Sequence, residues 1–254
     1  LIKEIKLNNP KKIIDLAVGE GSLLIEAIKK WPNSRYYSND IDSDCCNSIC
    51  QIDPTITSFN KDIFRIDTID YLKKNIGKVD LCIGNPPFYL IKQNEDTIRI
   101  LEKYNLDTIY STNNIPAEII YILQCLTILS KNATLALILP DGFFVNDNLE
   151  KFRKFIIEHY YIEKIIELPS NIFKKTDAKT HIIILKNIEY KTYEVELSTI
   201  FSPNKILINK KQALKRMDYS YYNYISDTNS FTMLKDVENI KIFRGKSKCL
   251  MNEI

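Results

Sequence analysis

The sequence predicts an α/β protein built on a doubly wound, mostly parallel sheet. Short apolar runs alternate with amphipathic stretches through most of the chain. The runs are unbroken and bounded by turn residues, which is typical of strands buried on both faces. With 254 residues, of which 45% are hydrophobic and 26% charged, the chain can bury a substantial core. These features predict a Rossmann-like sheet with helices on both faces.

The expected strands and helices follow one another along the chain. Strands are expected at residues 13–18, 36–41, 79–83 and 135–139, and helices at residues 23–31, 45–52, 119–129 and 149–157. A further short strand is expected before Asp62. Residues 89–114 form a long polar stretch between a strand and a helix, and we expect a functional or disordered loop there.

Two more strands are expected at residues 162–168 and 181–186. The segment between them is too short for a crossover helix, so the strands should pair as an antiparallel hairpin at one edge of the sheet. After about residue 190 the alternation weakens. We therefore expect a catalytic domain at residues 1–190 and a C-terminal extension at residues 191–254.

Composition narrows the class of protein. No apolar run approaches the roughly 20 residues of a membrane span, and the start has no signal-peptide layout, so we expect a cytoplasmic protein without a membrane partner. The six cysteines lack the C-x-x-C spacing of a zinc site, which predicts reduced thiols and no metal. Lysine and arginine are in excess over residues 151–216, and such a face suits a polyanion.

The first expected strand leads into a glycine-containing turn over residues 15–22. Gly19 and Gly21 would let a ligand approach the backbone and the helix that follows. A dinucleotide site would need a third glycine at position 24, where this chain has Leu24, so a nucleotide without a pyrophosphate fits better.

Acidic residues follow the next two expected strands. Asp40 lies about twenty residues beyond the turn, where a carboxylate can accept both ribose hydroxyls, and Asp62 can meet an adenine amino group. Asp42 is better explained as a helix N-cap. The candidate cofactor-binding residues are Asp15, Ala17, Gly19, Gly21, Asp40, Ile41, Asp62 and Asn85.

The candidate catalytic residues are Asn85, Pro86, Pro87 and Phe88, directly after the strand at 79–83. An amino nitrogen on a purine ring is a poor nucleophile because its lone pair is delocalised. If the Asn85 side-chain oxygen and the Pro86 carbonyl accept its hydrogens, the lone pair can turn toward a methyl sulfonium. The prolines hold these acceptors in place, and Phe88 can stack on the ring. The alternative is a rigid turn that only ends a strand.

A base inside a duplex cannot reach such a pocket, so it must be flipped out. The loop between the hairpin strands offers Phe173 for the other face of the base and three lysines for phosphates, Lys174, Lys175 and Lys179. An equally good explanation is that Phe173 packs on its own sheet.

With these motifs the chain resembles the amino-methylating DNA methyltransferases of restriction-modification systems. The marks are residues 15–22, the tetrad at 85–88, residues 135–143, and residues 167–173 followed by Lys179-Thr180. The last two resemble type I modification subunits and fused type IIG enzymes. Residues 216–247 resemble the junction to a target-recognition domain.

The resemblance implies a site-specific DNA adenine-N6 methyltransferase core that uses S-adenosylmethionine. It implies DNA as a partner, together with a specificity domain or subunit and a restriction module. Because the family's upstream motif is not present before Leu1, a fragment or truncated gene product is expected. Two alternatives stay open: a glutamine or ribosomal RNA methyltransferase, and an inactive fragment that binds only cofactor or a partner.

Overall fold

The structure is a computed structural model that describes residues 1–107, 113–170, 172, 179–188, 190 and 193–227. Its strands are β1 (Lys12–Asp15), β2 (Arg35–Asp40), β3 (Thr57–Asn60), β4 (Val79–Gly84), β5 (Leu90–Lys92), β6 (Asn114–Pro116), β7 (Leu129–Pro140), β8 (Tyr161–Glu167), β9 (Thr180–Lys186), β10 (Glu194–Thr199) and β11 (Ser202–Asn209). Its helices are α1 (Ser22–Lys30), α2 (Ser43–Ile52), α3 (Thr68–Ile76), α4 (Glu95–Glu102), α5 (Ala117–Ile128), α6 (Asp141–Val145), α7 (Glu150–His159), α8 (Lys210–Lys215) and α9 (Tyr219–Asp227). Short 3-10 helices form η1 (Ile2–Glu4) and η3 (Asp147–Leu149).

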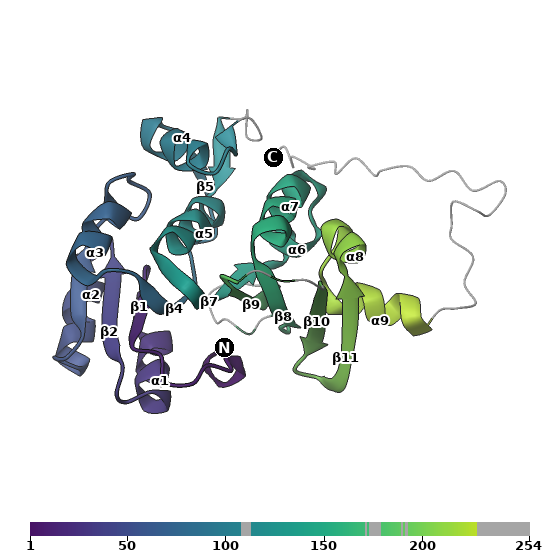
Figure 1. Ribbon diagram of the computed structural model, residues 1–254, viewed down its shortest axis with the longest axis horizontal. Helices are drawn as coiled ribbons and strands as arrows, with labels where there is room; N and C mark the ends of the chain where they lie inside the picture. Colours follow the sequence, from purple (N-terminus) through teal and green to yellow (C-terminus); the bar gives the residue numbers. More distant parts are fainter. Residues whose placement is uncertain (108–112, 171, 173–178, 189, 191–192, 228–254) are drawn as a thin grey trace, which may run out of the picture.

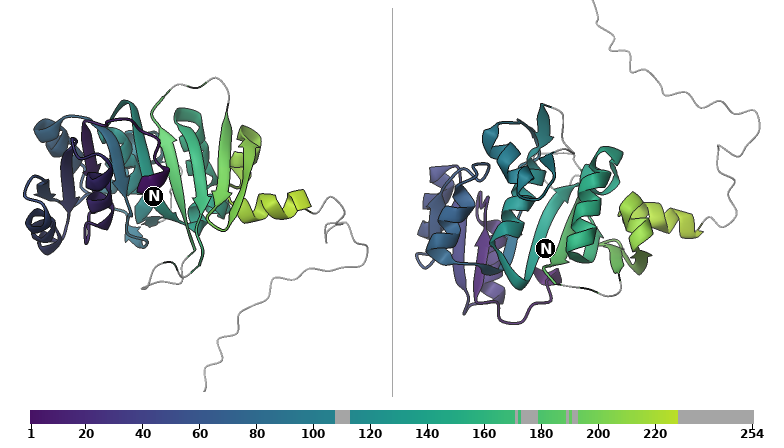
Figure 2. Two further views of the ribbon diagram at one scale, coloured as in Figure 1. Left: turned by 90° about the horizontal axis from the view of Figure 1, so that it is seen from below. Right: turned by 45° about the horizontal axis from the view of Figure 1, so that its top comes forward.

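The described residues form a nine-stranded sheet in the order β11-β10-β8-β9-β7-β4-β1-β2-β3. Neighbouring strands from β7 to β3 pair in parallel, as β8 does with β10. Strands β9 and β11 run against their neighbours. Figure 2 shows one continuous sheet from the dark β1–β3 end to the yellow-green β10–β11 end. The predicted doubly wound, mostly parallel fold is therefore confirmed.

The predicted hairpin forms, but its predicted place at the sheet edge is wrong. Strands β8 and β9 pair antiparallel, with Glu167 opposite His181. However, β9 lies between β8 and β7, and a second hairpin of β10 and β11 forms the edge. Most residues of β11 are exposed or half-buried, so this strand lacks the apolar run that marks the inner strands. The sheet thus continues past residue 190.

Helices cover both faces of the sheet. The larger core packs α3, α5 and α7 against one face, and the smaller core packs α1, α2 and η1 against the other. In Figure 1, α5 and α7 lie above the sheet and α1 lies below it. Helix α5 is buried on nearly all sides, because α3 and α4 contact it from outside the sheet. This burial fixes the start of α5 near the carboxyl ends of the parallel strands.

The polar stretch at residues 89–114 is not the loop that was expected, as far as it is described. Strands β5 and β6 pair antiparallel, and α4 lies between them in the chain. Asn94 begins α4 with a capping box, in which its side chain and that of Thr97 each accept a hydrogen bond from the other residue's backbone. Ile100 and Leu101 are buried beneath the helix. Helix α4 of this segment packs against α5, and its strands β5 and β6 form one wall of the site.

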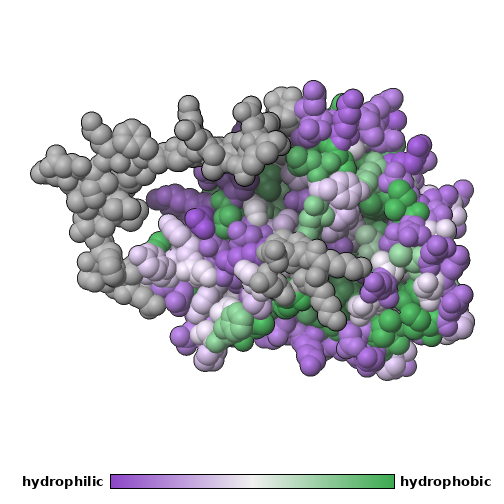
Figure 3. Space-filling model, turned by 180° about the vertical axis from the view of Figure 1, so that it is seen from behind, coloured by the Kyte–Doolittle hydropathy of each residue, from purple (hydrophilic) through white to green (hydrophobic). Residues whose placement is uncertain are grey.

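The surface is mixed in character. On the face shown in Figure 3, apolar side chains lie in separate groups among hydrophilic ones. Within the described part of the chain, every helix is too short or too polar to cross a membrane.

Candidate active site

The turn after β1 needs both of its glycines. Gly19 and Gly21 have φ angles of +50° and +78°, in the region that side chains other than glycine rarely adopt. A Cβ on Gly21 would also collide with the side chain of Ile49 in α2. The glycines therefore let the chain turn sharply into α1, and the N–H groups of Gly19 and Gly21 donate within the protein, to Asp40 and to the Val18 carbonyl.

Asp40 at the end of β2 faces this turn. Its carboxylate accepts hydrogen bonds from the backbone N–H of Gly19 at 2.8 Å and of Asp42 at 3.0 Å. The interpretation of Asp42 as a helix N-cap is confirmed, because its side chain accepts from Asp44 N at 2.8 Å. The Ile41 side chain is 68% exposed. An apolar surface beside an acid fits a ribose with a purine attached.

Asp62 lies on the same side of the site as Asp40. One carboxylate oxygen accepts from Phe64 N at 2.9 Å, and the residue is half-buried. Its place after β3, the neighbour of β2, puts it on the same edge of the sheet as Asp40. The structure thus brings Asp40, Ile41 and Asp62 to one edge.

Asp15 lies beneath the site and is only 2% exposed. Burial raises the pKa of its carboxyl to about 7; a hydrogen bond from Ala17 N opposes this rise, and the negative charge of Asp40 adds to it. A Cβ on Gly84 would come within 3.4 Å of the Asp15 carboxyl and would collide with the hydroxyl of Tyr121. Asp15 therefore lies between the turn after β1 and the end of β4.

Sequence reasoning missed Tyr121. It lies in the middle of the apolar helix α5 and is fully buried. Burial is the main reason that the pKa of its hydroxyl lies well above the usual value. A single tyrosine in an apolar run gives no sign that its hydroxyl reaches a strand end, so periodicity could not find it.

The tetrad Asn85-Pro86-Pro87-Phe88 follows β4 without regular structure. Pro86 is buried and Asn85 is exposed. Within the described part of the chain, the Asn85 amide has no hydrogen-bond partner, so its oxygen is available to a substrate. Because β4 lies between β1 and β7, the tetrad lies between the turn after β1 and the cavity described next.

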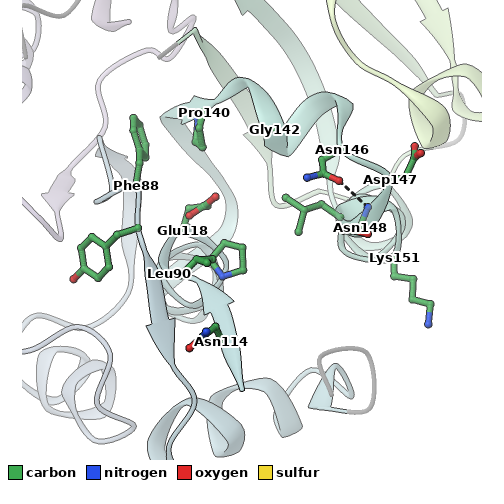
Figure 4. Close-up of a pocket in the computed structure, with 13 residues that line it drawn as sticks. Phe88, Leu90, Asn114, Glu118, Pro140, Gly142, Asn146, Asp147, Asn148 and Lys151 are labelled. Atoms are coloured by element: carbon green, nitrogen blue, oxygen red, sulfur yellow. Dashed lines mark hydrogen bonds between the residues drawn. The ribbon is translucent and has the colours of Figure 1, made fainter. Parts of the chain in front are cut away.

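A cavity of about 810 Å³ opens beside Phe88 (Figure 4). Its walls come from the tetrad, β5, β6, the start of α5, and the segment after β7. The lining residues are Phe88, Tyr89, Leu90, Asn114, Pro116, Glu118, Pro140, Gly142, Asn146, Asp147, Asn148, Leu149 and Lys151. The size and the mostly apolar walls suit a planar organic group.

The candidate DNA residues lie between β8 and β9 in the sequence. Phe173, Lys174 and Lys175 lie outside the described residues. Lys179 is described, and its ammonium lies 2.8 Å from Glu167 and 3.6 Å from Asp141. Although burial lowers the pKa of Lys179, these carboxylates outweigh it and raise the pKa above its ordinary value.

The same ion cluster holds neighbouring elements together. His181 Nε2 lies 2.8 Å from Asp141 Oδ1, and Ser220 N donates to Glu167 at 2.9 Å. Burial raises the pKa of Glu167, but its hydrogen bonds with Lys179 and Ser220 bring it below the usual value. The cluster thus links β8, β9, α6 and α9. Among the described residues, no group of three or more histidine, cysteine or acidic side chains could hold a metal.

The doubly wound sheet that carries the Asn-Pro-Pro-Phe tetrad after β4 has the fold of class I S-adenosylmethionine-dependent methyltransferases. The chain belongs to the N-6 DNA Methylase family, which matches residues 1–243. It is 23% identical over 192 residues to the type I restriction enzyme MpnII methylase subunit of Mycoplasma pneumoniae, covering 68% of this chain and 35% of that protein.

Two further similarities agree with this family. The chain is 26% identical over 195 residues to the type II restriction enzyme and methyltransferase RM.Eco57I of Escherichia coli, covering 76% of this chain and 19% of that protein. A type I restriction-modification methyltransferase subunit of Streptococcus thermophilus has a similar fold, with a TM-score of 0.60 at 21% identity over 85% of this chain and 48% of that one. The chain therefore spans half or less of the length of these relatives.

Proposed function

We propose that this chain is the catalytic core of a DNA adenine-N6 methyltransferase of a restriction-modification system. The observation that carries the proposal is the position of Asn85-Pro86-Pro87-Phe88 at the end of β4, between the turn at Gly19 and the Phe88 cavity. Family membership supports DNA as the substrate.

The cofactor would be S-adenosylmethionine, which supplies a methyl group on a sulfonium when it is bound. Asp40 would accept the ribose hydroxyls, Ile41 would pack on the adenine ring, and Asp62 would face its amino group. The main chain at Ala17, Gly19 and Gly21 would line the remainder of the site. The half-buried acids Asp40 and Asp62 fit a cationic nucleoside better than an anionic one.

The tetrad would act on the amino nitrogen of the target base. The Asn85 side-chain oxygen and the Pro86 carbonyl accept its two hydrogens, which localises the lone pair on nitrogen. As the new N–C bond forms, the bond from the methyl group to sulfur would break and leave its electron pair on sulfur. The nitrogen would lose one proton toward these acceptors and then to solvent. Phe88 stacks on the base after it leaves the duplex, and Phe173 and the lysines of its loop remain proposed contacts for the base and the phosphates.

We further propose that residues 1–190 form the catalytic domain and that residues 191–254 lead toward a target-recognition domain. The support is the resemblance of residues 216–247 to such a junction. The first part of this extension is attached to the sheet, because β10 pairs with β8 and Ser220 binds Glu167. A specificity module and a restriction module are the expected partners.

Methyl transfer from labelled S-adenosylmethionine tests the proposal. Wild type and Asn85→Ala are offered unmethylated bacterial DNA, ribosomal RNA and a release factor in one reaction. Label in DNA adenine that Asn85→Ala abolishes is the expected result. Label in RNA or in glutamine would show that the substrate is RNA or a protein and not DNA. Cofactor binding without transfer to any of the three would favour an inactive core.

A further inference from the structure

Glu118 is a buried carboxyl group that the tetrad chemistry does not use. It lies in the first turn of α5 and is 6% exposed. No other residue in the described part of the chain pairs with its carboxylate by a hydrogen bond or an ion pair. Its side chain lines the Phe88 cavity, and in Figure 4 it extends from α5 toward the space between Phe88 and Pro140. Its carboxyl therefore has no partner from another described residue and borders the cavity, where a ligand can hydrogen-bond to it.

The cavity lies on the substrate side of the site. Its walls follow β4 and β7, whereas Gly19 and Asp40 follow β1 and β2. Phe88, Leu90 and Pro140 give it apolar walls, and Glu118 is a single acidic group on α5 within it. This combination suits a flat, uncharged ring with a polar edge.

We propose that Glu118 is a specificity-determining residue whose carboxyl hydrogen-bonds to the ring nitrogen N1 of the flipped adenine. The inference rests on the proposed function, because it takes the cavity as the pocket for the target base. A ring nitrogen of adenine only accepts hydrogen bonds, so Glu118 must donate through a protonated carboxyl. Guanine carries N–H at N1 and would not match a donor there.

The surroundings favour the protonated form. Burial raises the pKa of the Glu118 carboxyl above its ordinary value, and its own backbone N–H opposes the rise. The other charged groups that line the cavity are Asp147 and Lys151, which come from the segment after β7. Asp141, next to Pro140, has its carboxylate engaged by His181 and Lys179. A bound base would exclude more water and favour the neutral carboxyl further.

Saturation-transfer NMR with deoxyadenosine as the probe tests the inference without turnover. Wild type, Glu118→Gln, Glu118→Ala and the control Glu150→Gln are compared between pH 6 and pH 9. Glu150 is an exposed acid at the start of α7, so the control makes the same chemical change in a similar helical position. Circular dichroism establishes that each variant is folded.

We expect Glu118→Ala to weaken deoxyadenosine binding about tenfold, the effect of one lost hydrogen bond in a buried site. Glu118→Gln keeps an N–H donor, so it should bind at all pH values, whereas wild-type affinity should fall as the pH rises. Glu150→Gln should follow wild type. Absent binding, equal affinity of wild type and Glu118→Ala, or an affinity that rises with pH would each overturn the inference.

Labelled methyl transfer to DNA, with Asn85→Ala alongside, separates this inference from the proposed function. Transfer that depends on Asn85 but not on Glu118 leaves the function standing and removes the role of Glu118. Glu118-dependent binding of deoxyadenosine without any transfer to DNA would support the role of Glu118 and contradict the proposed function.

Discussion

The backbone N–H of Gly19 donates a 2.8 Å hydrogen bond to the carboxylate of Asp40, which ties the turn after β1 to the end of β2. The two residues are 21 positions apart in the chain. Because the same carboxylate also accepts from Asp42 N, Asp40 fixes the shape of the turn and still faces the expected ribose site. Substitutions can therefore separate the contribution of Asp40 to cofactor binding from that of the acidic residues next to it.

Replacing Asp40 by alanine should weaken binding of S-adenosylmethionine by at least about tenfold. The change removes an ionised acceptor, and a hydrogen bond to a charged group is worth about 1.5–3 kcal/mol. Titration calorimetry measures the effect. Asp44→Ala is the matched control, since Asp44 is exposed on α2. Unchanged affinity in a folded Asp40→Ala protein would place the ribose elsewhere.

The buried Asp15 should make stability depend on pH. Its pKa is raised from 3.8 to about 7 in the folded protein, mainly by burial. The stability that this group provides is full below its unfolded pKa and is lost as the pH rises through 7. Between pH 5 and pH 8, wild type should therefore lose about 2 kcal/mol of unfolding free energy relative to Asp15→Asn. Urea unfolding at both pH values measures the difference, and parallel pH profiles would show that Asp15 is ionised in the fold.

The parts of the fold that could be predicted are those whose burial forces one pattern. Strands inside a covered parallel sheet are apolar on both faces, which is why β1, β4 and β7 stand out in the sequence. Strand β11 lies at the edge and is mostly exposed, so its composition marks only a short strand-like stretch at residues 205–209. The start of α4 did carry a signal, the pair Asn94 and Thr97, but polar residues around it favoured a loop.

The residues of the candidate site also divide into those that the sequence marks and those that it does not. The glycine turn and the tetrad were visible because backbone geometry and chemistry restrict the residue types there. Tyr121 and Glu118 were not, because both belong to α5, whose residues are buried on nearly all sides. In such a helix, hydrophobic periodicity does not tell which side chain points at a strand end and which into a cavity. Only the packing of α5 on the sheet separates them.

Gly84 and Tyr121 should be coupled. A Cβ added at Gly84 would collide with the Tyr121 hydroxyl, so Gly84→Ala should destabilise the protein by about 1–3 kcal/mol. Tyr121→Phe removes that oxygen and should restore part of the loss. Urea unfolding of the two single variants and the double variant gives the coupling energy. Additive effects would mean that the hydroxyl moves aside and that the contact does not constrain the end of β4.

Binding to mixed-sequence duplex DNA should be weak and should fall steeply with salt. Lysine and arginine contacts to phosphates release counterions, so each lost contact lowers the slope of log affinity against log salt by about 0.9. Lys179 is the described lysine of the predicted DNA loop, and a phosphate must compete with Glu167 and Asp141 for it. We therefore expect Lys179→Met to reduce the slope by at most about 0.9, the contribution of one phosphate contact.

Fluorescence anisotropy between 50 and 200 mM salt measures this slope. Lys29→Met is the control, because Lys29 is also paired with an acid but lies on α1. A slope for Lys179→Met equal to those of wild type and the control would limit Lys179 to holding Glu167 and Asp141 in place. A tight, site-specific complex at physiological salt would contradict the weak binding expected here, because it would require base readout by residues that this chain contains.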